Sequence, residues 1–308
     1  MISVVVPVYN EERSVALLYE ELQAALDPLS TPWEAVFVDD GSTDGSFAAL
    51  TRLHARHDNV RVVRLRRNFG KSAALATGFE LARGEWVVTL DADLQDEPAE
   101  IPRLLARLEE GWDLVSGWKR DRQDPRSKTW PSRLFNGVTG WLTGVRLHDF
   151  NSGFKAYRRE VVEEIRLYGE LHRFIPALAA WWGFRVDELP VHHRARRFGR
   201  SKFGSARFWR GCLDLVTVLF LTRYTRRPLH LFGGLGLAAW TVGFGANLYL
   251  TGLWLAGVRP IGTRPLLAFG VLSMLVGIQF FAVGLLSELI LSYQTKSADD
   301  VSVRCRLG

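Results

Sequence analysis

The hydrophobic and polar positions of the first 120 residues alternate between short β-rich runs and stretches with helical spacing. Apolar runs predict strands at 2–7, 34–39, 60–65, 85–91 and 113–117. Several are apolar at consecutive positions, which is typical of parallel strands covered on both faces. Between the first two, Val15, Leu18 and Leu22 recur at the spacing of a helix over 11–26. The pattern predicts a Rossmann-like α/β domain, whose ligands collect at the carboxyl ends of the strands.

The section from 118 to 192 has a mixed pattern. It predicts helices near 131–143 and 171–182 and strands at 153–157 and 184–191. Residues 203–221 align apolar side chains between basic ends, and Arg210 and Asp214 interrupt the run. A helix lying in the membrane interface therefore fits this segment better than a span.

Two long windows near the C-terminus, 228–258 and 265–287, contain no Asp, Glu, Lys or Arg. Each exceeds the roughly 20 residues that a bilayer-spanning helix needs. Buried core helices are the alternative, but such helices seldom stay uncharged for so long. We expect two membrane spans, at about 229–256 and 265–291, which would form a transmembrane hairpin.

The basic residues indicate how these spans are oriented. No basic segment precedes the first strand, so no signal peptide is expected. Basic residues lie before the first span and after the second, although Arg259 and Arg264 in the connecting loop weaken this bias. We expect a multi-pass protein of the inner membrane, with the N-terminal domain and the tail at 294–308 in the cytoplasm.

The net charge of +6 is unevenly distributed, because the stretch from Arg194 to Arg227 holds ten Lys and Arg and one acid, Asp214. Such a patch often binds nucleic acid. Beside a membrane span, attraction to anionic head groups of the lipid bilayer is the better interpretation, and no nucleic-acid partner is expected. The two cysteines, Cys212 and Cys305, are too few for a disulfide framework and fit a reducing compartment.

The stretch VTLDADLQDEP at 88–98 places four acidic residues directly after an apolar run. On an extended backbone Asp91, Asp93 and Gln95 point to the same side. Carboxylate and amide oxygens suit Mg²⁺ or Mn²⁺, and Mg²⁺ typically completes its shell with substrate phosphates. Asp96 and Glu97 are better explained as the opening of a helix, whose dipole they complement. The first three residues therefore predict a metal site.

Polar clusters also follow the first two strands, with PVYNE at 7–11 and VDDGSTDGS at 38–46. Taken singly, each cluster is a turn followed by a helix cap. Three polar strand ends on one edge of a sheet predict a ligand site more strongly than any one of them.

Together with RNFGKSAALATGF at 67–79, these segments resemble the family-2 glycosyltransferases of the GT-A fold. Further matches lie at 116–125, 148–161, 171–178 and 196–204. The whole set resembles the polyprenyl-phosphate branch, similar to dolichol-phosphate mannose synthase and bacterial undecaprenyl-phosphate glucosyltransferases. The resemblance covers nearly the whole chain. It implies an inverting enzyme that moves one sugar from a nucleotide-diphosphate sugar to a polyprenyl phosphate, with Mg²⁺ or Mn²⁺ as cofactor and a cytoplasmic catalytic domain.

The resemblance also assigns residues to the donor. Those expected in the donor pocket are Pro7, Tyr9, Glu11, Val38, Asp40, Gly70, Lys71 and Ala92. Asp40 would accept a hydrogen bond from a base N–H. Asp91, Asp93 and Gln95 would hold the metal, and Asp93 counts as catalytic as well. Arg196 and Lys202 would clamp the diphosphate and stabilise its charge as it leaves.

On the acceptor side the resemblance is looser. Lys119, Lys128 and Ser132 fall where relatives bind the acceptor phosphate, with Arg133 and Arg122 as competitors. Lysine stands where arginine is common, so a point charge would replace bidentate recognition. Asp149 lies where such enzymes place a base. A phosphate with a second pKa of about 6 needs no deprotonation, so a base is less necessary here. Asp149 would therefore orient the acceptor or stabilise positive charge at the anomeric centre, and the alternative is a structural carboxylate that caps the turn at 151–153.

The donor sugar and the organisation complete the prediction. UDP-glucose is favoured, with GDP-mannose or another donor as the alternative. A processive polysaccharide synthase would carry a Q-x-x-R-W motif and more spans, and a non-catalytic scaffold would have lost the metal or diphosphate ligands. Neither pattern fits this chain. We expect a GT-A domain at 1–202, an interfacial helix at 203–227 and spans within 228–293, and a homo-oligomer is left open.

Overall fold

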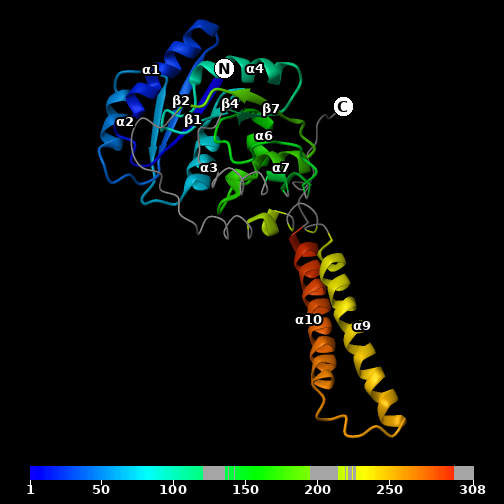
Figure 1. Cartoon of the computed structure of the whole chain (residues 1–308). Coiled ribbons are helices and arrows are strands. Elements are labelled where there is room, and N and C mark those ends of the chain that lie inside the picture. The colour runs from blue at the N-terminus through cyan, green and yellow to red at the C-terminus, as the bar shows by residue number, and fades with distance from the viewer. Residues whose placement is uncertain are drawn as a thin grey trace. The chain divides into compact units, whose positions relative to one another are not determined.

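The computed structural model describes residues 1–120, 136–137, 139–141, 143–194, 214–218, 220, 224 and 227–294. The chain divides into two compact units, Met1–Val218 and Leu219–Gly308. The first unit is built on a β-sheet and the second on a pair of long helices (Figure 1).

One seven-stranded sheet organises the first unit. In chain order its strands are β1 (Ile2–Val8), β2 (Trp33–Asp39), β3 (Val60–Arg64), β4 (Trp86–Thr89), β5 (Leu114–Lys119), β6 (Lys155–Arg158) and β7 (Val186–Val191). In space the order is β3-β2-β1-β4-β6-β5-β7, and β6 runs antiparallel to both of its neighbours. Every strand predicted from an apolar run is present, and the antiparallel β6 makes the sheet mixed.

Helices cover both faces of this sheet (Figure 1). One face carries α1 (Val15–Leu26), α2 (Ser46–His54) and α4 (Ile101–Glu109), and the other carries α3 (Lys71–Leu81), α6 (Arg159–Glu164) and α7 (Ile175–Trp181). Short 3₁₀ helices occur at η1 (Asp27–Leu29), η2 (Pro98–Glu100) and η3 (Leu171–Arg173). The described residues between 136 and 143 are helical, as predicted, whereas most of 203–227 lies outside the described residues.

The main core lies between the sheet and the layer of α1, α2 and α4. Val4 and Val6 of β1 point into it and pack with Leu18 and Leu22 of α1, all four fully buried. The helical spacing of the apolar residues in 11–26 therefore identified the buried face of α1, although the helix begins only at Val15.

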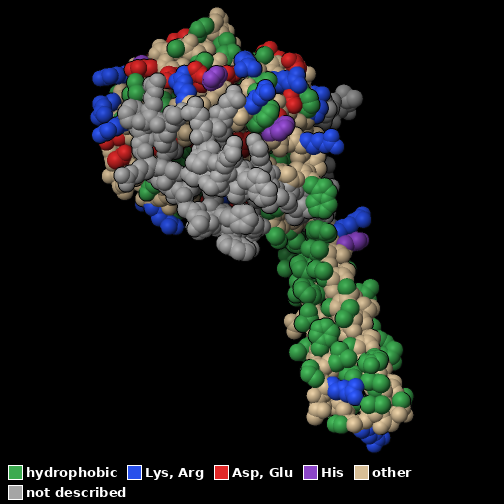
Figure 2. Space-filling model, viewed as in Figure 1, with side chains coloured by type: hydrophobic (Ala, Val, Ile, Leu, Met, Phe, Trp, Pro, Cys, Tyr) green, Lys and Arg blue, Asp and Glu red, His purple; other side chains and the backbone are tan. Residues whose placement is uncertain are grey.

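The second unit is a helical hairpin of α9 (Pro228–Leu255) and α10 (Pro265–Gln294). With 28 and 30 residues at 1.5 Å per residue, the helices are about 42 and 45 Å long, more than the roughly 30 Å of a bilayer core. Among the described residues these two helices are long and apolar enough to cross a membrane. Hydrophobic side chains cover their outer surface (Figure 2). The predicted pair of spans is therefore present as two candidate transmembrane helices.

The two helices of the hairpin approach each other through glycines. A Cβ atom on Gly243 would lie 2.5 Å from the carbonyl oxygen of Gly270, and one on Gly236 would lie 2.6 Å from that of Gly277. Small residues at such contacts let membrane helices pack backbone against backbone. Gly236, Gly243, Gly270 and Gly277 thus have a packing role.

Candidate active site

Hydrogen bonds join the loops that follow β1 and β2. The Asn10 N–H donates to Ser42 Oγ at 3.0 Å, and Asn10 Oδ1 accepts from the Thr43 N–H at 2.8 Å. The Glu11 N–H donates to Ser46 Oγ at 2.8 Å. The two polar strand ends therefore form one continuous surface at the carboxyl edge of the sheet.

Asp40, the first residue after β2, holds the loop that leads into α3. Its two carboxylate oxygens accept the Phe69 N–H at 2.7 Å and the Gly70 N–H at 2.9 Å. Burial raises the pKa of the Asp40 carboxyl, and these two N–H groups act against that shift. Gly70 has a φ of 94°, a backbone conformation that suits glycine. Asp40 was predicted to accept a hydrogen bond from a base N–H of the donor, and in this structure its carboxylate accepts from two backbone N–H groups.

Three segments that are far apart in the sequence meet at Asp91. Lys71, the first residue of α3, forms an ion pair with the Asp91 carboxylate. The loop before β6 lies against both, because a Cβ atom on Gly153 would be 2.7 Å from Asp91 Oδ2 and 2.8 Å from Lys71 Nζ. Thr89 Oγ1 donates to the Gly153 carbonyl oxygen at 2.8 Å. Glycine at 153 leaves room for this pair, a role that sequence analysis did not identify.

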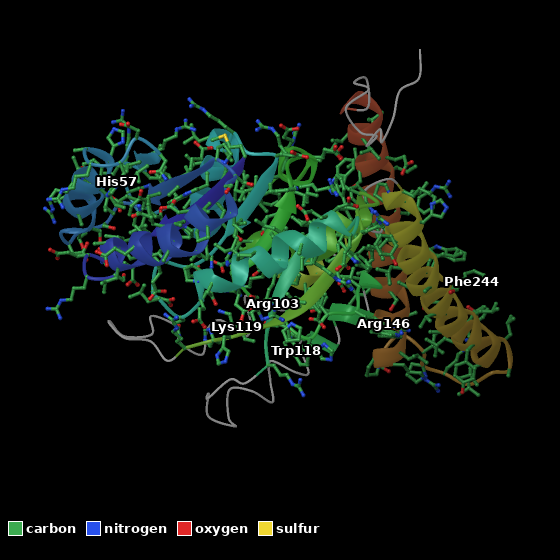
Figure 3. All side chains as sticks on the ribbon, turned by 90° about the horizontal axis from the view of Figure 1, so that it is seen from above. His57, Arg103, Trp118, Lys119, Arg146 and Phe244 are labelled. Atoms are coloured by element: carbon green, nitrogen blue, oxygen red, sulfur yellow. The ribbon has the colours of Figure 1, made fainter. Side chains whose placement is uncertain are left out.

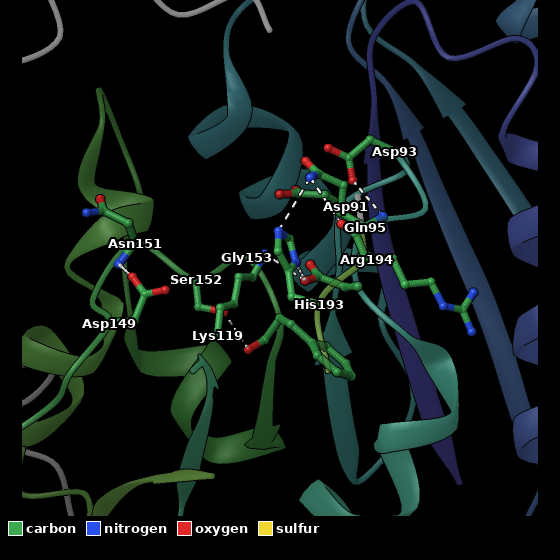
Figure 4. Close-up of polar contacts among 12 residues, drawn as sticks. Asp91, Asp93, Gln95, Lys119, Asp149, Asn151, Ser152, Gly153, His193 and Arg194 are labelled. Atoms are coloured by element: carbon green, nitrogen blue, oxygen red, sulfur yellow. Dashed lines mark hydrogen bonds and ion pairs between the residues drawn. The ribbon is translucent and has the colours of Figure 1, made fainter. Parts of the chain in front are cut away.

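The acidic run leaves the sheet earlier than predicted. β4 ends at Thr89, and the following residues turn, with Leu94 at a φ of 60°. The expectation that Asp91, Asp93 and Gln95 alternate along an extended strand is therefore wrong. The turn still brings the three side chains together (Figure 4), and Asp93 Oδ1 accepts the Gln95 N–H at 3.2 Å.

Asp96 lies behind this turn in a buried cluster of charges. Its Oδ1 atom lies 2.7 Å from Nζ of Lys119, the last residue of β5 (Figure 3). The same oxygen lies 3.4 Å from Nδ1 of His193, which follows β7. The Lys119 contact is an ion pair rather than an aligned hydrogen bond, and the His193 ring lies beside Asp96 without a hydrogen bond, since neither Asp96 oxygen has a hydrogen-bonding partner among the described residues. The interpretation of Asp96 as the opening of a helix is therefore wrong.

The charges of this cluster stabilise one another. Burial alone would raise the pKa of the Asp96 carboxyl, but Lys119 and His193 outweigh burial and hold that pKa well below its usual range. Burial likewise opposes the charged form of Lys119, but the carboxylates of Asp96, Asp91 and Asp149 together outweigh burial, so the pKa of Lys119 is raised. Lys119, predicted to bind the acceptor phosphate, already has a buried anionic partner.

Arg194 ties the acidic turn to the segment that follows β7. Its guanidinium lies 2.9 Å from Glu21 of α1 and forms a second ion pair with Glu97. The Arg194 N–H donates to the Gln95 carbonyl oxygen at 2.8 Å. Glu97 does precede η2, as predicted, but its side chain makes no capping hydrogen bond there.

Two further charged side chains are buried near the loop before β6. Asp149 Oδ1 accepts the Asn151 N–H at 3.1 Å, the capping bond that the sequence left open. Lys155 of β6 donates to the Ser152 carbonyl oxygen. Burial, followed by the nearby Lys71, lowers the pKa of the Lys155 ammonium to about 7. The sequence pattern does not mark Lys155 as a site residue, because a lysine in a strand-like run usually faces solvent.

The other predicted donor residues divide into two groups. Pro7, Tyr9 and Glu11 are half-buried at the end of β1. Val38 and Ala92 are 0% and 3% exposed, so neither residue presents an open surface to a donor in this structure. The predicted residues that lie outside the described part of the chain are Arg122, Lys128, Ser132, Arg133, Arg196 and Lys202.

The oxygen atoms gathered at the turn fit a hard divalent cation. Asp91 and Asp93 offer carboxylate oxygens and Gln95 an amide oxygen, the ligand types that Mg²⁺ and Mn²⁺ prefer. In the described part of the chain no three His, Cys, Asp or Glu side chains gather as a metal cluster. The Gln95 oxygen and substrate phosphates would therefore have to complete the shell of a cation.

Comparison with known families places these residues in context. The family model described as glycosyl transferase family 2 matches residues 3–166. The chain belongs to this family. The match includes β1 to β6 and with them Asp40, Lys71 and the acidic turn. The resemblance seen in the sequence motifs is therefore confirmed.

Relatives extend the similarity over nearly the whole chain. Dodecaprenyl-phosphate galacturonate synthase of Rhizobium johnstonii is 40% identical over 311 residues, covering 98% of this chain and 90% of the relative. Undecaprenyl-phosphate 4-deoxy-4-formamido-L-arabinose transferase of Pseudomonas aeruginosa is 40% identical over 309 residues, covering 99% and 88%. Both alignments include the candidate membrane helices.

A solved structure confirms the predicted GT-A fold. Glucosyl-3-phosphoglycerate synthase from Mycobacterium tuberculosis, in complex with Mn²⁺, UDP and phosphoglyceric acid, superimposes with a TM-score of 0.57 at 21% identity. The similarity covers 72% of this chain and 78% of the other.

Proposed function

We propose that this protein transfers one sugar from a nucleoside diphosphate sugar to a polyprenyl phosphate, with inversion at the anomeric carbon. The observation that carries this proposal is the 40% identity to two polyprenyl-phosphate sugar transferases over 98–99% of the chain. The family match and the oxygen ligands at the carboxyl edge of the sheet support the same reaction.

The candidate membrane helices fit a lipid acceptor. Withdrawing a polyprenyl tail from a bilayer costs about 0.8 kcal/mol for each CH₂ group, so the enzyme has to work at the membrane surface. We propose a multi-pass protein of the inner membrane whose catalytic unit faces the cytoplasm. The ten basic residues between Arg194 and Arg227, just before α9, support this orientation.

The residues divide the work of the reaction. Asp91, Asp93 and Gln95 would hold a divalent cation, which when bound supplies positive charge beside the leaving diphosphate. We assign Arg196 and Lys202 to the same leaving charge. Asp40 and Gly70 border the proposed site for the base and ribose of the donor.

On the acceptor side, an oxygen of the lipid phosphate attacks the anomeric carbon. The bond from that carbon to the nucleoside diphosphate breaks, and its electron pair leaves with the diphosphate. Since the phosphate is mostly dianionic at neutral pH, no base has to remove a proton. We assign Asp149 to orienting the acceptor and Lys128, Ser132 and Arg133 to binding its phosphate. Lys119 is the weakest acceptor candidate, because Asp96 already pairs with it.

For the donor we propose a UDP sugar, with UDP-glucose first. The relatives named for galacturonate and for formamido-arabinose carry different sugars at the same overall identity. The test therefore offers UDP-glucose, UDP-galacturonate, UDP-4-deoxy-4-formamido-L-arabinose and GDP-mannose, each with undecaprenyl phosphate and Mn²⁺.

The expected product is a lipid that carries a single sugar from one of these donors. A long polymer would indicate a processive synthase, and no transfer from any donor would refute the proposal. Alanine at Asp91 or Asp93 should abolish transfer, since both are proposed metal ligands. Alanine at Glu97 should leave most of it, because Glu97 bonds to Arg194 outside the proposed ligand set.

A further inference from the structure

The contacts of the Gln95 side chain define how its amide is oriented. Its Nε2 atom lies 3.4 Å from the carbonyl oxygen of Arg194 and 3.4 Å from His193 Nε2. A carbonyl oxygen only accepts hydrogen bonds, so the Gln95 atom that faces Arg194 has to be the amide nitrogen. Both N–H groups of the Gln95 amide are then directed at His193 and Arg194, and neither contact uses the Gln95 Oε1 atom.

The same contact determines the tautomer of His193. Because His193 Nε2 faces an N–H donor, it has to carry the lone pair, and the ring proton sits on Nδ1. Nδ1 lies 3.4 Å from Asp96 Oδ1, a carboxylate that is 0% exposed and that favours a proton on the facing nitrogen. An antiparallel bridge between Asp96 and His193 holds the two backbones in this register.

From this geometry we infer that His193 is a positioning residue of the metal site. With its Nδ1 facing Asp96 and its backbone held by the bridge to Asp96, the His193 ring accepts from the Gln95 amide and so leaves the Gln95 carbonyl oxygen for a divalent cation beside Asp91 and Asp93 (Figure 4). This inference rests on the proposed metal-dependent function. The reversed amide would direct two N–H groups at the cation, which repel it.

The lengths of these contacts suit a role in orientation more than one in stability. At 3.4 Å, both lie at the long end of the hydrogen-bonding range and contribute little to folding. Their effect is to select one of two amide orientations. That selection matters because the described residues offer no third carboxylate for the cation. Partners behind a metal ligand commonly change metal affinity by about 10- to 100-fold when removed.

The test measures Mn²⁺ binding to the full-length protein in detergent, with UDP present, from the electron paramagnetic resonance signal of free Mn²⁺. We expect His193→Ala to weaken Mn²⁺ binding by about tenfold or more. His193→Gln should restore most of the affinity, because the glutamine carbonyl can accept where Nε2 did. His192→Ala is the matched control, since His192 is the exposed neighbour and should bind Mn²⁺ as the wild type does.

A double-mutant cycle with Gln95→Ala separates positioning from a general structural role. If His193 acts through Gln95, His193→Ala should change Mn²⁺ affinity less than about twofold once Gln95 is alanine. Melting temperatures without Mn²⁺ show whether each variant is folded, and His193→Gln keeps the test valid if His193→Ala is not.

Three results would overturn the inference: unchanged Mn²⁺ affinity in His193→Ala, the same loss with and without Gln95, or a wild type that holds no Mn²⁺. None of them depends on sugar transfer. A wild type that shows the expected binding cycle but transfers no sugar to lipid would refute the proposed function and leave the inference standing.

Discussion

Replacing Lys119 with methionine tests how much the buried Asp96–Lys119 pair stabilises the first unit. The two side chains are 0% and 9% exposed, and the charged atoms are 2.7 Å apart. At an effective dielectric constant of about 20, two unit charges at this distance attract by about 6 kcal/mol, which the desolvation of both groups largely offsets. The substitution removes the attraction but leaves Asp96 desolvated.

The expected loss is about 3–5 kcal/mol, the usual result of leaving a buried charge without its partner. Domains are stable by only about 5–15 kcal/mol, so this loss is a large fraction of the total. In a unit of this size each kcal/mol shifts the melting temperature by about 2–4 °C. The melting temperature should therefore fall by about 6–20 °C.

The assay is thermal unfolding of the full-length protein in detergent, followed by tryptophan fluorescence. Arg103→Met is the matched control, because Arg103 pairs with Glu100 at the surface and is 55% exposed. Such surface pairs contribute about 0–1 kcal/mol, so this variant should melt close to the wild type.

A second variant separates the missing charge from the altered shape of the side chain. Asp96→Leu combined with Lys119→Met replaces the pair by apolar groups, an exchange that is often neutral or stabilising. We expect the double variant to recover most of the lost stability. The reasoning is refuted if Lys119→Met has the melting temperature of the wild type. It is also refuted if the double variant has a melting temperature as low as that of the single variant, because the loss would then not come from an unpaired charge.

Three more predictions follow from buried groups and close contacts. Asp149→Asn keeps the oxygen that bonds the Asn151 N–H, so we expect an unchanged melting temperature but a turnover reduced by about tenfold or more; near-normal turnover would remove Asp149 from the catalytic residues. Lys155 loses its proton near pH 7 when folded but only near 10.5 when unfolded, so stability should rise with pH across that window, and Lys155→Met should flatten the rise. Gly243→Val should lower the detergent stability of the hairpin by about 1–3 kcal/mol, whereas Gly245→Val, with open space around it, should not.

Local patterns predicted the elements of the fold, because strands and helices depend on neighbouring residues. The apolar runs placed every strand of the sheet, and the charge-free windows placed α9 and α10 to within a few residues. The prediction was wrong at the end of β4, where the chain leaves the strand early and forms a turn that contains Leu94 at a positive φ. A positive φ is uncommon for an apolar residue, so the sequence gives no signal for this turn.

The candidate site was predictable only in part, because several of its contacts join distant segments. The spacing and the oxygen-bearing side chains of the acidic run predicted Asp91, Asp93 and Gln95 as metal ligands. Nothing local in the sequence indicates that Gly153 lies against Asp91, or that Asp96 is buried beside Lys119. Charged residues are expected at the surface, so a buried pair becomes visible only when the strands that carry it are adjacent.

The choice of an amide at position 95 has an electrostatic reason. Without a cation, Asp91 and Asp93 already place two negative charges at the turn, and Lys71 pairs with one of them. A third carboxylate would add repulsion to the empty site, whereas an amide supplies an oxygen ligand without charge. A carboxylate presents an oxygen whichever way it is turned, but an amide can present either its oxygen or its NH₂ group. Neighbouring residues therefore have to fix the orientation of the amide. A neutral third ligand therefore requires a hydrogen-bond acceptor behind it, and His193, bridged through its backbone to the buried Asp96, is placed to be that acceptor.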